Sequence, residues 1–131
     1  MTARSTGLSH VAMSVPLGTL TDEYRQNVLD FYGAILGWRE IEQLRLPDRM
    51  TIAVGSSSYV NLRERDDAAT YRGYDHFGVL VGSEDELRQL WDELDRNHPE
   101  VTLRAISGSG RALTFRMQYL IPLAVEVQFF G

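Results

Sequence analysis

The chain alternates between two kinds of hydrophobic spacing, and their order predicts its secondary structure. Residues 8–15, LSHVAMSV, place apolar side chains at nearly every second position, which is typical of a strand with one buried face. From Thr21 the spacing becomes that of an amphipathic helix, which Gly37 is placed to end. The apolar face of this helix consists of Tyr24, Val28, Phe31, Tyr32, Ile35 and Leu36. Three further strands are expected at residues 37–44, 49–55 and 57–64.

The same order then begins again after a polar loop at residues 65–73. A strand is expected at 75–81, followed by a helix that starts with a capping box formed by Ser83 and Glu86. Pro99 ends this helix, because it disfavours helical geometry at the residue before it. Further strands are expected at 101–107, 111–118 and 123–130, with a turn at 107–110. The order β-α-β-β-β therefore occurs twice, which predicts one domain, 1–131, with modules at about 6–66 and about 72–131.

Polar side chains recur in phase with this repeat. His10 and His76 lie in the first strand of each module, and Asn61 and Glu126 lie in the fourth. Because strand side chains alternate between two faces, all four share a face with small residues such as Gly78. The opposite face is bulky and apolar, and the two helices are available to cover it. Small residues beside converging polar groups leave room for a ligand.

Two imidazoles and one carboxylate on one face suit a divalent metal with open coordination positions. The candidate metal ligands are His10, His76 and Glu126. Two simpler interpretations stay open at this point: His76 as a core histidine satisfied by one hydrogen bond, and a His–Glu hydrogen-bond network across the sheet. The candidate substrate pocket consists of the remaining polar residues of this face, Asn61, Tyr59, Arg63 and Gln128. No catalytic residue is assigned.

Composition narrows the class of protein. The 131 residues are 44% hydrophobic and 24% charged, which is ordinary for a soluble globular domain. The absence of cysteine excludes disulfides, thiolate zinc sites, iron–sulfur clusters and a cysteine nucleophile. A net charge of −5 with arginines scattered singly along the chain argues against a nucleic-acid partner. The chain shows neither a membrane-length apolar run nor a signal peptide, so a cytoplasmic protein with no membrane partner is expected.

These motifs resemble the vicinal oxygen chelate superfamily, which includes glyoxalase I, bleomycin-resistance proteins, fosfomycin-resistance proteins and extradiol dioxygenases. The similar stretches are LSHVAMSV, VLDFYGAILGW, YDHFGVLV and LAVEVQFF, which together span nearly the whole chain. The resemblance implies an α+β fold in which two βαβββ modules form one cupped mixed β-sheet with helices on the outer face. It also implies a divalent metal (Fe, Mn, Zn or Ni), with the family's metal positions at His10, Asn61, His76 and Glu126.

The chain departs from the family pattern at two places. The stretch before the last strand, MQYLIPLAVE, lacks the Asp-Pro-x-Gly turn that the family often has there. Asn61 stands where glyoxalase-like members carry Glu or Gln, and an amide cannot act as a base. This departure argues against typical glyoxalase I activity. It leaves a metal-dependent lyase, dioxygenase or transferase that chelates a small oxygen-rich substrate.

Two other functions stay open. A metal-free small-molecule binding protein of the bleomycin-resistance type would use aromatic walls, for which Trp38, Tyr59 and Tyr119 are candidates. A ferredoxin-like duplication acting as a sensor or interaction module is disfavoured, because each module has one strand too many. A homodimer is expected, since cupped sheets leave strand edges and the apolar C-terminal strand 125–130 is expected to need cover.

Overall fold

The elements fall into two groups, one on each side of a boundary between Ala69 and Thr70, in a computed structural model that describes residues 6–109 and 111–131. Unit 1 contains β1 (His10–Pro16), α1 (Asp22–Leu36), β2 (Arg39–Glu40), the 3₁₀ turn η1 (Glu42–Leu44), β3 (Arg49–Val54) and β4 (Ser58–Arg65). Unit 2 contains β5 (His76–Leu80), α2 (Glu84–Asn97), β6 (Thr102–Leu103), β7 (Ser107–Ser109), β8 (Ala112–Gln118) and β9 (Ala124–Phe130). The predicted α+β class with a repeated βαβββ order is confirmed.

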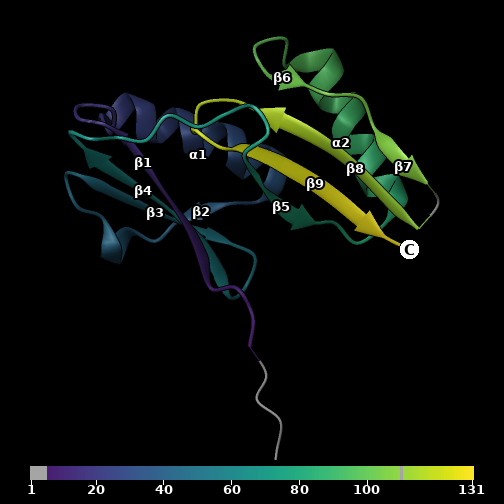
Figure 1. The fold of residues 1–131 in the computed structure, drawn as a ribbon, viewed down its shortest axis with the longest axis horizontal. Coiled ribbons are helices and arrows are strands. Elements are labelled where there is room, and N and C mark those ends of the chain that lie inside the picture. The colour runs from purple at the N-terminus through teal and green to yellow at the C-terminus, as the bar shows by residue number, and fades with distance from the viewer. Residues whose placement is uncertain (1–5, 110) are drawn as a thin grey trace, which may run out of the picture. The chain divides into compact units, whose positions relative to one another are not determined.

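The two sheets have the same topology (Figure 1). Their strand orders are β1-β4-β3-β2 and β5-β9-β8-β6, and in each the first strand pairs in parallel with the last. The register also repeats, since Ala12 lies opposite Asn61 in unit 1 and Gly78 lies opposite Glu126 in unit 2. His10 and His76 are therefore equivalent positions, as are Asn61 and Glu126. This confirms the repeat that the sequence predicts.

Helix α1 and one face of its sheet form the core of unit 1. Thr21 caps the helix by accepting a hydrogen bond from the backbone N–H of Tyr24 at 3.1 Å, and Gly37 ends it in a left-handed conformation with φ of 73°. The buried apolar side chains are Met13, Val15, Leu20, Val28, Phe31, Tyr32, Ile35, Trp38, Met50, Ile52, Val60 and Leu62. Each buried aliphatic side chain contributes about 1.5–3 kcal/mol. His10, Ser14, Tyr59, Asn61 and Arg63 are thereby left on the opposite face, as predicted.

One buried residue of α1 was not expected from its helical spacing. Arg25 is only 4% exposed, whereas the neighbouring Tyr24, predicted on the apolar face, is half-buried. The Arg25 guanidinium donates to the carbonyl oxygens of Leu20, Leu46, Pro47 and Arg49. It also lies 3.6 Å from a carboxylate oxygen of Glu40, which is itself buried and paired with Arg45. Arg25 therefore ties α1 to the segment that leads into β3.

Helix α2 packs on its sheet in unit 2 through contacts with β8 and β9 (Figure 1). Ser83 caps the helix by accepting from the Glu86 backbone N–H at 3.1 Å, while the Glu86 carboxylate accepts from Gly82 N–H at 3.0 Å. The helix ends at Asn97, before Pro99, as expected. The buried core of unit 2 includes Leu87, Leu94, Phe115, Met117, Val125 and Val127. Among the described residues, no helix is long and apolar enough to cross a membrane.

Four strand predictions need correction. The strand expected at 101–107 is limited to Thr102–Leu103, because residues 104–106 leave the regular pairing with β8 before it resumes at Ser107. The strand expected at 37–44 is limited to Arg39–Glu40, because Glu40 turns into the interior and the chain folds back so that Arg45 can reach it. The turn expected at 107–110 is partly a strand, since Ser107–Ser109 pairs with β8, and residue 110 lies outside the described residues. The C-terminal strand β9 is also no edge strand needing cover, because it lies between β5 and β8.

Gly108 is required by the close approach of β7 and β8. Its φ is 111°, and a Cβ built there would lie 2.0 Å from the carbonyl oxygen of Ala112. We therefore expect Gly108→Ala to lower the free energy of unfolding by about 2–3 kcal/mol. Chemical denaturation measures this loss, with Gly73→Ala as the control, since a Cβ at Gly73 meets no atom within 4 Å. Equal stability of the two variants would contradict the expectation.

Candidate functional site

His76 and Glu126 approach each other across β5 and β9. The Nδ1 atom of His76 lies 2.7 Å from the carbonyl oxygen of Tyr74. Because a carbonyl oxygen can only accept, this contact assigns the ring proton of the neutral imidazole to Nδ1. The other ring nitrogen, Nε2, then carries a lone pair and lies 3.6 Å from Oε2 of Glu126. Two acceptors thus face each other, and this arrangement is stabilised when a proton or a metal cation lies between them.

Arg116 is the third charged residue of this cluster. It lies on β8 directly opposite Glu126, and its Nε donates to Oε1 of Glu126 at 3.3 Å. Its guanidinium carbon also lies 5.3 Å from the centroid of the Tyr74 ring, within the range of a cation–π interaction. The side chains of His76, Glu126 and Arg116 are 22%, 18% and 19% exposed, so solvent reaches all three. The sequence prediction missed Arg116, although alternation along residues 111–118 would place it on the polar face if the register were known.

The polar face of unit 1 holds the remaining predicted residues except Gln128. The imidazole of His10 stacks on the ring of Tyr59, with centroids 4.7 Å apart and planes 5° apart, and its Nδ1 lies 2.7 Å from the Ser9 hydroxyl. Asn61 is half-buried, and its Oδ1 is fully buried without a hydrogen-bond partner among the described residues. Arg63 is exposed on the same face. The polar face of unit 1 thus carries one imidazole and one amide oxygen without a partner among the described residues.

In unit 2, the side chains of His76 and Glu126 are spaced so that both can bind the same divalent metal. A metal binds imidazole nitrogen and carboxylate oxygen at about 2 Å each, so the two ligand atoms lie about 3–3.5 Å apart. The observed separation of 3.6 Å is close to this. Arg116 contacts Oε1 of Glu126, so Oε2, which faces His76, is the oxygen more available to a metal. Within the described ranges, no group of three or more His, Cys, Asp or Glu side chains is gathered at ligand distance.

Three more residues proposed from the sequence, Trp38, Tyr119 and Gln128, can be placed in the fold. Trp38 is 3% exposed and stacks on Tyr32 with centroids 4.6 Å apart, so it belongs to the core of unit 1 and not to a ligand wall. Tyr119 follows β8 and is half-buried. Gln128 is half-buried on β9, opposite Leu80 and Thr114, on the same face as Glu126.

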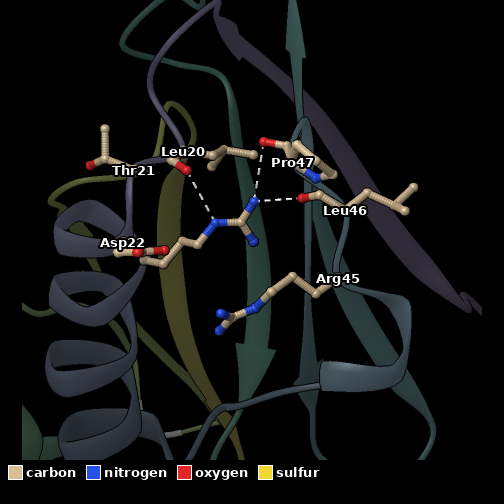
Figure 2. Close-up of a pocket in the computed structure, with 7 residues that line it drawn as sticks. Leu20, Thr21, Asp22, Arg45, Leu46 and Pro47 are labelled. Carbon is tan, nitrogen blue, oxygen red and sulfur yellow. Dashed lines mark hydrogen bonds between the residues drawn. The ribbon is translucent and has the colours of Figure 1, made fainter.

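A pocket of about 440 Å³ lies elsewhere in unit 1, beside the start of α1 (Figure 2). Its lining residues are Leu20, Thr21, Asp22, Arg25, Arg45, Leu46 and Pro47. None of the predicted site residues is among them. Both guanidinium groups at this pocket are paired, that of Arg25 with backbone carbonyls and Glu40 and that of Arg45 with Glu40. The pocket therefore reflects how Arg25 holds the chain, and we assign it no ligand.

Comparison with known proteins agrees with this fold. The family model of the Glyoxalase/Bleomycin resistance protein/Dioxygenase superfamily matches residues 7–114. The fosfomycin resistance protein FosX from Listeria monocytogenes is 15% identical with a TM-score of 0.68, covering 98% of this chain and 96% of that chain. Lactoylglutathione lyase from Agrobacterium tumefaciens is 14% identical with a TM-score of 0.69, covering 96% and 95%.

A glyoxylase/bleomycin resistance protein/dioxygenase domain from Frankia sp. EAN1pec is 18% identical with a TM-score of 0.70, covering 98% of this chain and 100% of that chain. At these identities the similarity to solved structures establishes the fold alone. Among curated protein sequences, none matches this chain significantly.

Proposed function

This chain belongs to the Glyoxalase/Bleomycin resistance protein/Dioxygenase superfamily, and we propose that it binds a small oxygen-rich ligand through a divalent metal. The proposed metal ligands are His10, His76 and Glu126. The observation that carries the proposal is the separation of 3.6 Å between Nε2 of His76 and Oε2 of Glu126, with Nδ1 tied to a carbonyl oxygen. A metal-binding histidine is commonly oriented in this way, by donating its other ring N–H to a carbonyl or carboxylate.

The other residues of the polar faces have distinct proposed roles. The carbonyl of Tyr74 holds the imidazole of His76 in one tautomer and one orientation. Arg116 pairs with Oε1 of Glu126 and so offsets the charge of this carboxylate when no metal is bound. Ligand-orienting roles are proposed for Tyr59, Asn61, Arg63 and Gln128. A bound metal would supply a Lewis acid that stabilises negative charge on ligand oxygens.

We propose an enzyme of the lyase, dioxygenase or transferase type, with no catalytic residue assigned. Two of the similar structures are named for a lyase and for fosfomycin resistance, and these names suggest the range of chemistry to test first. Asn61 occupies the position equivalent to Glu126, and its amide cannot take a proton from a substrate. Proton abstraction by a carboxylate at this position is therefore not available, which argues against typical glyoxalase I chemistry.

Metal analysis tests the metal function directly. Protein purified without chelator is expected to retain Fe, Mn, Zn or Ni in stoichiometric amount, measured by elemental analysis. After removal of the metal with EDTA, adding back the preferred ion is expected to raise Tm, because a ligand that binds only the folded state stabilises it. If the protein retains none of these metals and none of them raises Tm, the metal function is wrong.

A metal-free binding protein is the second candidate, and one observation favours it. The carboxylate of Glu126 already has a cationic partner in Arg116, at 3.3 Å, and this partner offsets the cost of partly burying its charge. Tight ligand binding that survives EDTA would support this function.

Arg116→Gln is expected to give opposite results under the two functions. If a metal binds Glu126, removing the guanidinium ends its competition for the carboxylate and its repulsion of the cation, so metal affinity should rise about tenfold. If Glu126 needs only Arg116, the variant should lose stability and gain no metal affinity. A competition titration with a fluorescent chelator and a denaturation curve measure both quantities. Arg104→Gln is the control, since Arg104 is an exposed arginine of the same unit.

We also propose that the protein is a homodimer. The strands β1 and β5 are at the edges of their sheets, and an edge strand leaves one row of backbone groups available for pairing. On β5 the side chain of Leu80 is 69% exposed, which adds apolar surface beside that edge. Light scattering coupled to size-exclusion chromatography measures the mass in solution, and the mass of a single chain would contradict the dimer.

A further inference from the structure

The polar face of the unit 1 sheet has an unusual charge. Strands β1–β4 carry four arginines on this face: Arg39, Arg49, Arg63 and Arg65. Arg49 lies opposite Arg63, Arg65 follows Arg63 by two residues on the same strand, and Arg39 lies in the row that contains Tyr59 and His10. Directly opposite residues of neighbouring strands share a face. Although the whole chain has a net charge of −5, four arginines thus gather on one side of one sheet.

No carboxylate of these strands lies on the same face. The two acidic residues within β1–β4 are Glu40 and Glu64. Glu40 is buried against Arg25 and Arg45, and Glu64 accepts a hydrogen bond from the backbone N–H of Leu20, at the start of α1. Both therefore point to the side that the helix covers. The positive charge on the polar face has no counterpart within the sheet.

Arg49 and Arg63 are the arginines that most need a partner. Like charges directly opposite each other destabilise an antiparallel pair. Within the described chain, neither side chain has a hydrogen bond or an ion pair, whereas Arg65, at the end of the same strand, is paired with Asp67 at 2.7 Å. The Nε of Arg49 is in addition fully buried without an acceptor.

The buried polar atoms that lack a hydrogen-bond partner also belong to residues of this polar face. Two buried side-chain polar atoms of the described residues lack a hydrogen-bond partner, Nε of Arg49 and Oδ1 of Asn61. Both residues lie on the polar face, one on β3 and the other on β4. A buried polar group without a partner costs about 1–3 kcal/mol, so such groups are rare unless a ligand or water satisfies them. The Nε of Arg49 is a donor that an anionic oxygen can satisfy, whereas Oδ1 of Asn61 is an acceptor and needs a donor from a ligand or water.

Unit 2 shows that the fold does not require arginines at these positions. By the repeated register, Arg63 is equivalent to Gln128 and Arg49 is equivalent to Thr114, and both of these are neutral. The same topology therefore forms with uncharged side chains in this row. The arginine pair is a feature of unit 1 that folding alone does not explain.

We propose that Arg49 and Arg63 form a site for an anionic oxygen group, so that the ligand of this protein is a carboxylate, phosphonate or phosphate. Guanidinium groups bind such anions through parallel N–H···O bonds, and one anion between two arginines removes their mutual repulsion. This inference deepens the function proposed above by naming its ligand class. It adds Arg49, which the sequence prediction did not include, to Arg63, which it did.

Anion binding is tested without metal, so that failure of the metal function does not decide the result. Methylphosphonate is titrated into ¹⁵N-labelled full-length protein in EDTA, and amide shifts in residues 59–63 are followed by NMR. Saturable shifts are expected with methylphosphonate and not with neutral dimethyl methylphosphonate. Arg63→Gln and Arg49→Gln are each expected to weaken binding about tenfold or more, and Arg63→Lys less. Arg88→Gln, which removes an exposed charge from α2, is expected to bind as the unmodified protein does.

Two results would overturn the proposal: no saturable shift with methylphosphonate, or the same affinity in Arg63→Gln as in Arg88→Gln. Arg63 is exposed, so its replacement tests the site even if Arg49→Gln fails to fold. Metal retention is measured separately, on protein prepared without EDTA. An anion site without a metal, and a metal without an anion site, are therefore distinguishable outcomes.

Discussion

His76→Ala is expected to lower the affinity for divalent metal at least about a hundredfold, because loss of a ligand costs more than the 10–100-fold loss typical of a residue that only orients one. The Nε2 lone pair faces Oε2 of Glu126 at 3.6 Å, and alanine leaves that carboxylate with Arg116 alone. Isothermal titration with the metal found in the purified protein measures the loss. His98→Ala is the matched control, since His98 caps the C-terminus of α2 and its Nδ1 lies 3.2 Å from Glu100.

Glu126→Gln separates the metal function from the metal-free one. The amide keeps the shape of the side chain, but it is a poor metal ligand and a weaker partner for Arg116. Loss of metal affinity in both His76→Ala and Glu126→Gln, with normal affinity in His98→Ala, would identify the pair as ligands. Normal metal affinity in His76→Ala would show that the metal, if present, is held elsewhere.

The faces of the strands could be predicted because each sheet buries one face under a helix. A period of two then fixes which side chains are polar and which are core, and His10, His76, Asn61 and Glu126 follow from it. The equivalence of the two modules is confirmed by register, since Asn61 and Glu126 lie opposite Ala12 and Gly78. What alternation cannot provide is the identity of the neighbour on the next strand.

The residues that were missed are those whose role depends on such neighbours. Arg116 meets Glu126 only because of the register of β8 with β9, which the turn between them sets. Arg49 was missed because the sequence shows it only as one of many scattered charges, and the pairing of β3 with β4 places it directly opposite the predicted Arg63. Arg25 is buried by carbonyl groups of a distant segment, and the helical period gives no sign of that segment.

Arg25→Ala is expected to lower the free energy of unfolding by about 3–5 kcal/mol, the range for removing one partner of a buried charged network. The guanidinium donates to Leu20 at 3.1 Å, to Leu46 at 2.6 Å and to Arg49 at 3.2 Å, and alanine leaves these carbonyl oxygens without that donor. Urea denaturation measures the loss. Arg45→Ala is expected to cost far less, because its side chain is 43% exposed and water can replace its bond to Glu40.

Arg25→Lys distinguishes the charge of Arg25 from its geometry. Lysine keeps a positive charge near Glu40, but it cannot donate to four carbonyl oxygens spread over two segments, so most of the stability should still be lost. Recovery of full stability with lysine would mean that the ion pair alone matters. Because Arg25 holds the carbonyl of Arg49, the first residue of β3, a partly folded Arg25 variant should also lose methylphosphonate binding. The helix-covered and polar faces of unit 1 are thus coupled through the start of one strand.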